Sequence, residues 1–109
     1  MAEILGTFEQ AVLLALVRLA NDAYGRAVLK EVQARLGREV AAGAVYATLE
    51  RLEDKALIAS RLGPGTPARG GRARRYYSIA AAGIRALNEA KAVAEGLWQG
   101  LTWPLGGYQ

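Results

Sequence analysis

The sequence predicts a mainly helical fold with a small β-hairpin, in the order of three helices, the hairpin and a longer C-terminal helix. Two observations predict this order. Apolar residues recur at helical spacing in four segments, and between the third and fourth the pattern changes to short runs of branched and aromatic residues. With 109 residues, 52% hydrophobic and 22% charged, the chain has the size and balance of one globular domain.

The first two helices are predicted from where their apolar side chains fall. Residues 8–20 are apolar in almost every turn, as expected of a buried core helix. A second helix is expected over residues 23–36. Its candidate N-caps are Asn21 and Asp22, and Gly37 ends its pattern.

The third helix is expected to begin near Ala42 and to end near Lys55 or Ala56. Its core-facing stripe consists of apolar residues spaced 4, 3 and 4 apart, namely Val45, Leu49, Leu52 and Ala56. A second stripe, about a quarter turn away at 100° per residue, consists of Ala44, Thr48, Arg51 and Lys55. Glu50 and Asp54 are expected on the back of the helix.

Two short runs, residues 57–62 and 75–79, have the composition of β-strands. The segment between them is rich in Gly and Pro, which predicts a hairpin with a long tip. No acidic residue occurs between Asp54 and Glu89, so the positive charge of the chain, +4 in total, is concentrated around this hairpin. Its tip carries Arg69, Arg72 and Arg74.

The last helix is expected over residues 81–101, with a heptad-like seam along one side. The seam positions alternate in spacing between 3 and 4 residues: Ile84, Leu87, Lys91, Ala94, Trp98 and Leu101. A three-helix core cannot cover so long a seam, so its expected use is packing against the same helix of a second copy. Lys91 is expected to snorkel or to help fix the pairing register.

The missing residue types exclude most enzyme chemistry. Without His or Cys, the chain has no Ser-His or Cys-His nucleophile, no zinc site of the usual kind and no disulfide. No acidic cluster suggests another metal site, so no enzymatic activity, cofactor or metal is expected. The longest strongly apolar run, residues 11–17, is shorter than the ~20 residues of a membrane span, which favours a cytoplasmic protein.

Three helices followed by a basic hairpin is the order of a winged helix-turn-helix. In that fold the third helix enters the major groove of DNA, and the hairpin, or wing, lies along the neighbouring backbone or minor groove. Small residues allow close approach, and hydroxyl and guanidinium groups reach bases and phosphates. The candidate DNA contacts are Ala42, Gly43, Tyr46, Thr48, Arg51 and Lys55 in the third helix, and Arg69, Arg72 and Arg74 in the wing.

Some of these residues have a second interpretation. Tyr46 is either a phosphate donor or an aromatic residue at the rim of the core. Arg51 is either a DNA contact or a partner of side chains on its own helix. The free amides around Gly43 are further candidates for receiving a phosphate.

The sequence resembles the PadR-like transcriptional regulators over roughly residues 5–87. The resemblance rests on four segments in order: 5–10 (LGTFEQ), 23–25 (AYG), 43–53 (GAVY, then RLE) and 69–77 (RGGR, then RYY). It implies a dimeric bacterial repressor with a winged helix-turn-helix, which binds an inverted-repeat operator and is often released by a small effector.

By position, the resemblance implies that residues 1–80 form the DNA-binding domain, and that 81–109 form a dimerisation helix and tail within the same compact unit. A single C-terminal helix is typical of the short subgroup of the family. Some of its members hold flat aromatic ligands against a Trp near the dimer axis, and Trp98 has a comparable place in the seam. Ordinary packing is the alternative for Trp98.

Two departures from the family pattern concern local geometry. Ala56 stands where relatives usually have a Gly after the third helix, which removes the easy left-handed cap. Ala80 to Ala82 stand where relatives usually have a Thr, so the last helix lacks a side-chain N-cap.

The expected function is therefore that of a homodimeric repressor that binds double-stranded DNA. An alternative is a winged-helix interaction module whose basic wing binds an acidic protein partner. The stripe of Thr48, Arg51 and Lys55 favours DNA, because a protein-binding helix does not require it. A third hypothesis, a ligand-binding protein with residual DNA affinity, depends on Trp98.

Overall fold

The computed structural model describes residues 4–64, 70 and 73–102. The elements follow one another as α1 (Thr7–Leu19), η1 (Ala20–Asp22), α2 (Gly25–Leu36), α3 (Ala42–Asp54), β1 (Ile58–Gly63), β2 (Arg74–Ile79) and α4 (Ala81–Trp98). This order confirms the predicted fold class, mainly helical with one β-hairpin. No helix in the described part of the chain is long and apolar enough to cross a membrane.

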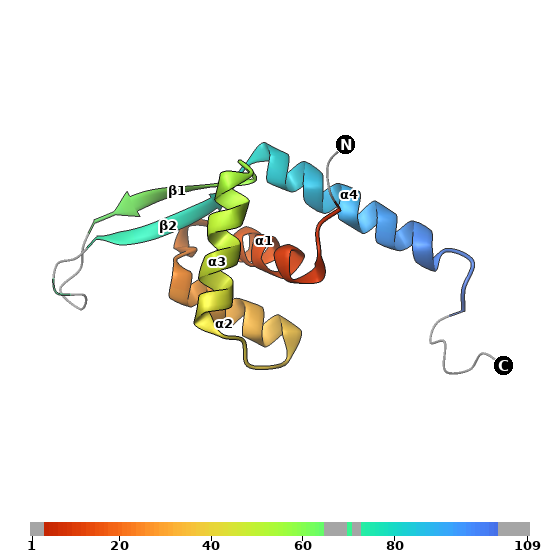
Figure 1. Cartoon of the computed structure of the whole chain (residues 1–109), viewed down its shortest axis with the longest axis horizontal. Helices are drawn as coiled ribbons and strands as arrows, with labels where there is room; N and C mark the ends of the chain where they lie inside the picture. Colours follow the sequence, from red (N-terminus) through yellow and green to blue (C-terminus); the bar gives the residue numbers. More distant parts are fainter. Residues whose placement is uncertain (1–3, 65–69, 71–72, 103–109) are drawn as a thin grey trace.

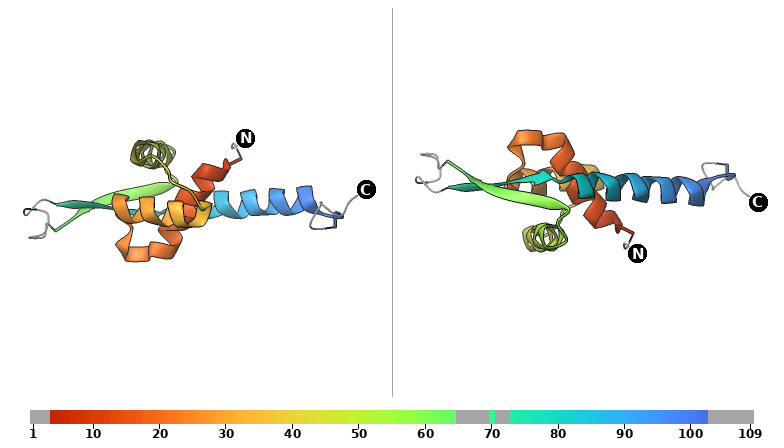
Figure 2. Two further views of the ribbon diagram at one scale, coloured as in Figure 1. Left: turned by 90° about the horizontal axis from the view of Figure 1, so that it is seen from below. Right: turned by 90° about the horizontal axis from the view of Figure 1, so that it is seen from above.

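The three N-terminal helices form the body of the molecule, and the remaining elements project from it (Figure 1). The hairpin extends to one side and α4 to the other, so that both lie along the long axis. Figure 2 shows the same opposition from below and from above, with α3 seen nearly end-on in both views. The hairpin therefore projects from the body beside α3, and most of α4 projects on the opposite side.

The core lies where α1, α2 and α3 meet. Each helix contributes apolar side chains three or four residues apart, which places them on one face. The largest fully buried side chains are Val12, Leu13, Val28, Val32, Val45, Thr48, Leu49 and Leu52. The predicted core stripe of the third helix is confirmed for Val45, Leu49 and Leu52, whereas Ala56 lies beyond the helix end and is exposed.

The start of α2 differs from the prediction. Asn21 and Asp22 do not cap it; they belong to the 3₁₀ turn η1, and Tyr24 is the N-cap, without a side-chain hydrogen bond. The reason is a long-range pairing. The Tyr77 N–H donates to the Ala23 carbonyl at 2.8 Å, and the extended Tyr24 forms an isolated bridge with Tyr76, so residues 23 and 24 lie beside β2.

α3 ends in a C-cap motif whose left-handed position is usually occupied by glycine. Ala56 has a φ of +62°, in the left-handed region. Its N–H donates to the Glu53 carbonyl at 2.9 Å and the Leu57 N–H donates to the Leu52 carbonyl at 3.0 Å, which is the Schellman pattern. Alanine thus adopts a conformation that costs an L-residue roughly 1 kcal/mol. At the end of α2, Gly37 adopts the same conformation with a φ of +70°, as predicted.

The hairpin pairs antiparallel from Ile58 opposite Ile79 to Gly63 opposite Arg74. This register confirms the two predicted strands, with bounds shifted by one residue. The predicted tip residues Arg69 and Arg72 lie outside the described residues.

The last helix begins at its expected position, and no side chain caps its N-terminus. Its first turn is anchored to the residue before β1: the Ala80 N–H donates to the Leu57 carbonyl at 2.9 Å, and a β-carbon on Gly83 would overlap that carbonyl. The helix ends at Trp98, earlier than predicted. Leu101 is therefore not on the helical seam, because the extended Gln99 and the left-handed Gly100 turn the chain away first.

Candidate nucleic-acid interface

The outward face of α3 begins with small residues. Ala42, Gly43, Ala44 and Ala47 are all exposed, and a β-carbon on Gly43 would meet nothing within 4 Å. No side chain caps this helix at Ala41, which leaves its first amides free. The N-terminal half of α3 therefore offers a small, uncharged surface to which another molecule can approach closely.

The C-terminal half of the same face is acidic. Glu50 and Asp54 are exposed, as their predicted place on the back of the helix implies. Carboxylates repel backbone phosphates, so this half is poorly suited to lie deep in a groove of DNA. The helix is therefore divided along its length into a small neutral half and an acidic half.

The structure contradicts the expected exposure of Thr48. Its side chain is only 2% exposed, and its Oγ1 accepts a hydrogen bond from Arg51 Nη2 at 3.1 Å. Thr48 lies at the edge of the core stripe, where helix wheels do not show which neighbouring helix covers the edge. It is therefore not available as a base contact, and its hydroxyl instead orients Arg51.

Lys55 is also engaged within the protein. Its Nζ lies 3.2 Å from Oε2 of Glu9 on α1, so this flank of α3 faces α1. Arg51 is exposed and, apart from Thr48, no described side chain forms a hydrogen bond or ion pair with it. Of the three polar residues on the predicted stripe, only Arg51 presents an exposed and unneutralised charge.

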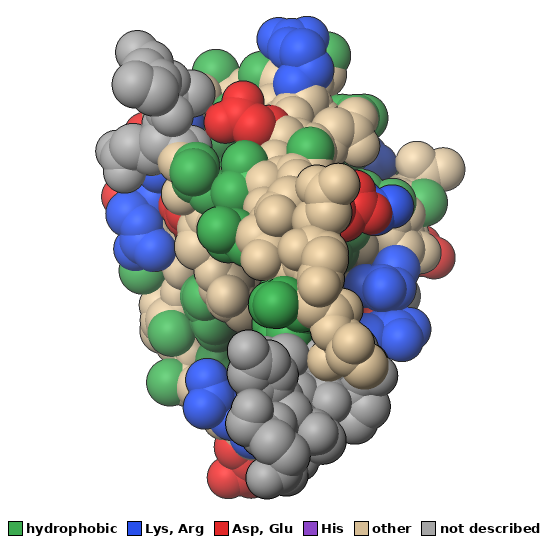
Figure 3. Space-filling view, turned by 90° about the vertical axis from the view of Figure 1, so that its right-hand side faces the viewer, with side chains coloured by type: hydrophobic (Ala, Val, Ile, Leu, Met, Phe, Trp, Pro, Cys, Tyr) green, Lys and Arg blue, Asp and Glu red, His purple; other side chains and the backbone are tan. Residues whose placement is uncertain are grey.

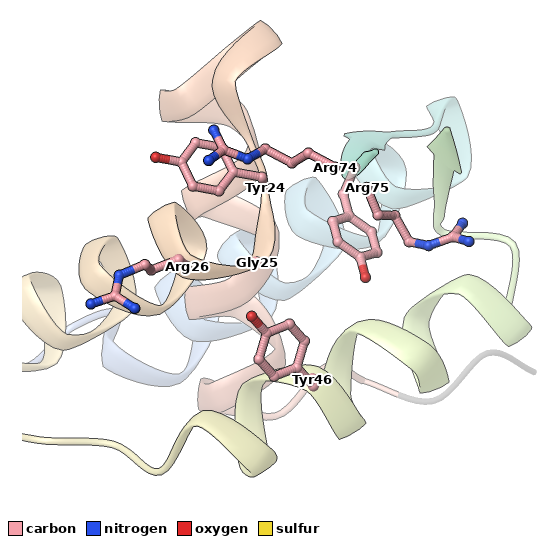
Figure 4. Close-up of a pocket in the computed structure, with 7 residues that line it drawn as sticks. Tyr24, Gly25, Arg26, Tyr46, Arg74 and Arg75 are labelled. Carbon is pink, nitrogen blue, oxygen red and sulfur yellow. The ribbon is translucent and has the colours of Figure 1, made fainter. Parts of the chain in front are cut away.

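Tyr46, on the opposite flank of α3, fits both of its predicted interpretations. Its side chain is 47% exposed, and its ring lies over the first residue of α2 (Figure 4). A β-carbon on Gly25 would overlap the ring and the hydroxyl of Tyr46, so only glycine permits this packing. The tyrosine thus packs at the rim of the core and keeps its hydroxyl near the uncapped N-terminus of α2.

Beside Tyr46 lies a pocket of about 180 Å³, which we call the Tyr/Arg pocket. Its walls come from α2, α3 and β2, which Figure 4 shows meeting around the start of α2. The lining residues are Tyr24, Gly25, Arg26, Tyr46, Arg74, Arg75 and Tyr77. Guanidinium groups, phenol hydroxyls and free helix amides are all hydrogen-bond donors suited to an anion.

The two arginines of β2 are held by contacts of different kinds. The Arg74 Cζ lies 3.9 Å from the centroid of the Tyr24 ring, a cation–π contact. Tyr24 in turn meets Tyr76 edge to face, with ring centroids 6.0 Å apart. Arg75 Nη1 donates to Ser60 Oγ at 2.9 Å, and that hydroxyl donates to Glu53 at 2.6 Å. The aromatic stack and the hydroxyl relay therefore connect the wing to α2 and α3.

The charges of this pocket are available to a ligand. Within the described residues, neither Arg74 nor Arg75 forms a direct ion pair with a carboxylate, and the buried Arg74 Nε has no hydrogen-bond partner. Burial raises the pKa of Tyr77, so its hydroxyl remains a donor at neutral pH. The arrangement can bind an oxyanion by charge and by hydrogen bonds together.

Part of this pocket was predicted from the sequence. Tyr46 and Arg74 were predicted contacts, whereas Tyr24, Arg26, Arg75 and Tyr77 were not. The sequence signal for them is the presence of two tyrosine-containing segments, AYG and RYY, which both belong to the family pattern. Their role depends on the bridge between Tyr24 and Tyr76, which has no local sequence signal.

A second hollow, the α1/α4 groove, lies away from this pocket and has a volume of about 470 Å³. It is lined by Gln10, Leu14, Val17, Ile84, Leu87, Asn88, Lys91 and Ala94. Four of the predicted seam residues therefore face it. Trp98, 48% exposed on the last turn of α4, is not among them. Figure 3 shows hydrophobic side chains exposed at this end of the molecule, with Lys and Arg toward the edges of the view.

Three packed helices, an antiparallel hairpin beside the third and a small-residue face on that helix define a winged helix-turn-helix protein. The family model described as "Transcriptional regulator PadR-like family" matches residues 13–89, and the chain belongs to this family. The resemblance found in the sequence is thereby confirmed. None of the curated proteins compared with the chain matches it.

Solved structures share this fold, and one of them is a PadR family member about one third identical to the chain. A PadR family transcriptional regulator from Eggerthella lenta is 34% identical, with a TM-score of 0.64 over 83% of this chain and 76% of that one. A PadR family regulator from Clostridium difficile is 23% identical, with a TM-score of 0.64 over 94% and 98%. BpsR of Bordetella bronchiseptica, whose DNA binding is described as regulated by 6-hydroxynicotinic acid, is 20% identical, with a TM-score of 0.60 over 92% and 70%.

Proposed function

We propose that this chain is a transcriptional repressor that binds double-stranded DNA with α3 and the wing. The observation that carries the proposal is the Tyr/Arg pocket, which places three arginines, three tyrosines and an uncapped helix N-terminus beside the neutral half of α3. A DNA strand running between recognition helix and wing passes over this point, so the pocket is suited to receive a backbone phosphate.

The roles of the individual residues follow from their positions. Ala42 and Gly43 permit close approach of the N-terminal half of α3 to the base edges. Tyr46 and the arginines of β2 bind the backbone, and Arg51, oriented by Thr48, is the base-reading or phosphate-binding side chain of α3. Arg69 and Arg72 of the wing tip add charge along the neighbouring backbone.

We further propose that the active form is a homodimer. Residues 1–80 act as the DNA-binding part, and α4 with the tail, residues 81–109, acts as the dimerisation part. The support is the α1/α4 groove, whose apolar wall continues the seam of α4 and suits the α4 of a second copy. Two recognition helices would then read half-sites about one helical turn, ~34 Å, or a multiple of it apart.

A small aromatic effector completes the proposal. It would bind between protomers near Trp98, where an aromatic ring is 48% exposed at the end of the seam. The regulation of BpsR by 6-hydroxynicotinic acid supports a ligand of this chemical class. The protein would act in the cytoplasm, without catalytic activity, metal or cofactor.

The test is fluorescence anisotropy with two labelled duplexes, the region upstream of this protein's own gene and a shuffled copy, titrated at several salt concentrations. We expect a preference of ~10³ or more for the first duplex. Weak binding of equal strength to both duplexes, falling steeply with salt, would mean that the protein binds DNA only by its positive charge and without sequence specificity. The acidic-partner alternative would then be favoured.

A further inference from the structure

Glu9 on α1 forms an ion pair with Lys55 at the end of α3, although the two residues are 46 positions apart in the sequence. Its Oε2 lies 3.2 Å from Lys55 Nζ, and its Oε1 accepts a hydrogen bond from the Gly6 N–H, also at 3.2 Å. The side chain of Glu9 is 18% exposed and that of Lys55 is 43% exposed. The carboxylate is thus fixed by the start of its own helix and receives Lys55 on its free side.

The electrostatic field of Glu9 extends beyond this one pair. Burial raises the pKa of the Glu9 carboxyl. The hydrogen bond from Gly6 and the charges of Lys55 and Arg51 lower it by more, so the net pKa is below its usual value. Glu9 is therefore ionised at neutral pH. Its charge attracts Lys55 and Arg51, the two basic side chains of the α3 stripe.

We propose that Glu9 is a positioning residue that limits DNA affinity, because its ion pair with Lys55 competes with backbone phosphates for that side chain. A phosphate that takes Lys55 must first break an ion pair that the folded protein has already formed. The protein consequently makes one phosphate contact fewer than its basic residues would allow. This inference rests on the proposed DNA-binding function and concerns how tightly the same surface binds.

The substitution Glu9→Gln isolates the charge, since a Gln amide oxygen still accepts the Gly6 hydrogen bond. Glu31→Gln is the matched control: Glu31 pairs with Arg35 on α2 at 2.7 Å, so the same charge and the same kind of ion pair are removed away from α3. Thermal melting of each variant shows whether it is folded. Any difference between the two variants in DNA binding then reports the position of the charge.

The measurement is the salt dependence of anisotropy on the shuffled duplex. We expect Glu9→Gln to bind more tightly and to steepen the slope of log K against log salt by ~0.9, the value of one added phosphate contact. Its advantage over the unmodified protein should then shrink about 3.5-fold between ~50 and ~200 mM salt. Glu31→Gln should leave the slope unchanged.

Lys55→Gln completes the design. By itself, Lys55→Gln should change the slope of log K against log salt little, because Lys55 is already paired with Glu9. In the double variant with Glu9→Gln, it should abolish the increase in slope that Glu9→Gln alone produces. Equal slopes for Glu9→Gln and Glu31→Gln, or a slope shallower by ~0.9 for Lys55→Gln alone, would overturn this inference and leave the proposed function intact. Failure of every variant to bind either duplex would overturn both, whereas absence of sequence preference would overturn the repressor assignment alone.

Discussion

The Tyr/Arg pocket and the α1/α4 groove are two hollows of this molecule that differ in size, charge and position. The pocket, about 180 Å³, is lined by arginines, tyrosines and a helix N-terminus beside α3. The groove, about 470 Å³, is lined mainly by aliphatic side chains, with Lys91 as its one charged residue among those described. The pocket can bind an anion by charge and hydrogen bonds, whereas the groove stabilises a bound partner mainly by burying apolar surface.

The contrast shows how a small chain separates two kinds of association. The anion-binding groups gather where the hairpin meets α2, and the apolar seam runs along α4, which projects the other way (Figure 1). A change to one hollow should therefore alter one property and leave the other, so each can be tested separately. α1 contacts both regions of the molecule: its Glu9 pairs with Lys55 at the end of α3, and its Leu14 and Val17 line the groove.

The largest effect is expected from a charge placed in the groove. Val17→Glu would bury a carboxylate in a mainly apolar interface, where removing the charge from water costs about 3 kcal/mol or more, and should weaken self-association more than ~100-fold. Sedimentation equilibrium measures this effect. Leu62→Glu, on an exposed position of β1, is the control and should leave self-association unchanged. If the Val17→Glu protein self-associates normally, the groove is not part of the dimer interface.

A smaller effect is expected from removing one arginine of the pocket. Arg75→Gln should weaken DNA binding about tenfold, because a hydrogen bond to a charged group contributes about 1.5 kcal/mol or more. Anisotropy at fixed salt measures the loss, while sedimentation should show unchanged self-association. Arg35→Gln removes the same charge from α2 outside the pocket and should cost less. Equal losses for both variants would mean that net charge, rather than the pocket, binds the DNA.

The smallest effect is expected at the C-terminal ends of α2 and α3. Ala56→Gly should raise the free energy of unfolding by about 1 kcal/mol, since glycine adopts a left-handed conformation without strain. Gly37→Ala, where a β-carbon would meet no atom within 4 Å, should lower it by a similar amount. Urea unfolding monitored by circular dichroism measures both changes. If both substitutions shift stability in the same direction, backbone strain is not the cause.

Much of the fold follows from local patterns. Helical spacing predicted α1, α2 and α3 to within two residues at each end, and the change of period predicted the hairpin. The end of α4 was missed because the apolar spacing continues through Leu101, whereas the backbone turns at Gly100. The cap of α2 was missed because a pairing with β2 overrides the capping preference of Asn21 and Asp22.

Local sequence alone indicates which segments are helical or extended and where positive charge is concentrated. It took the folded arrangement to bury Thr48, to pair Lys55 with Glu9, and to bring Tyr24 and Arg75 into one pocket. The physical reason is that periodicity reports which face of an element is apolar, a property of neighbours in sequence. Which element covers a flank, and which charge it brings, depends on contacts between residues far apart in the chain.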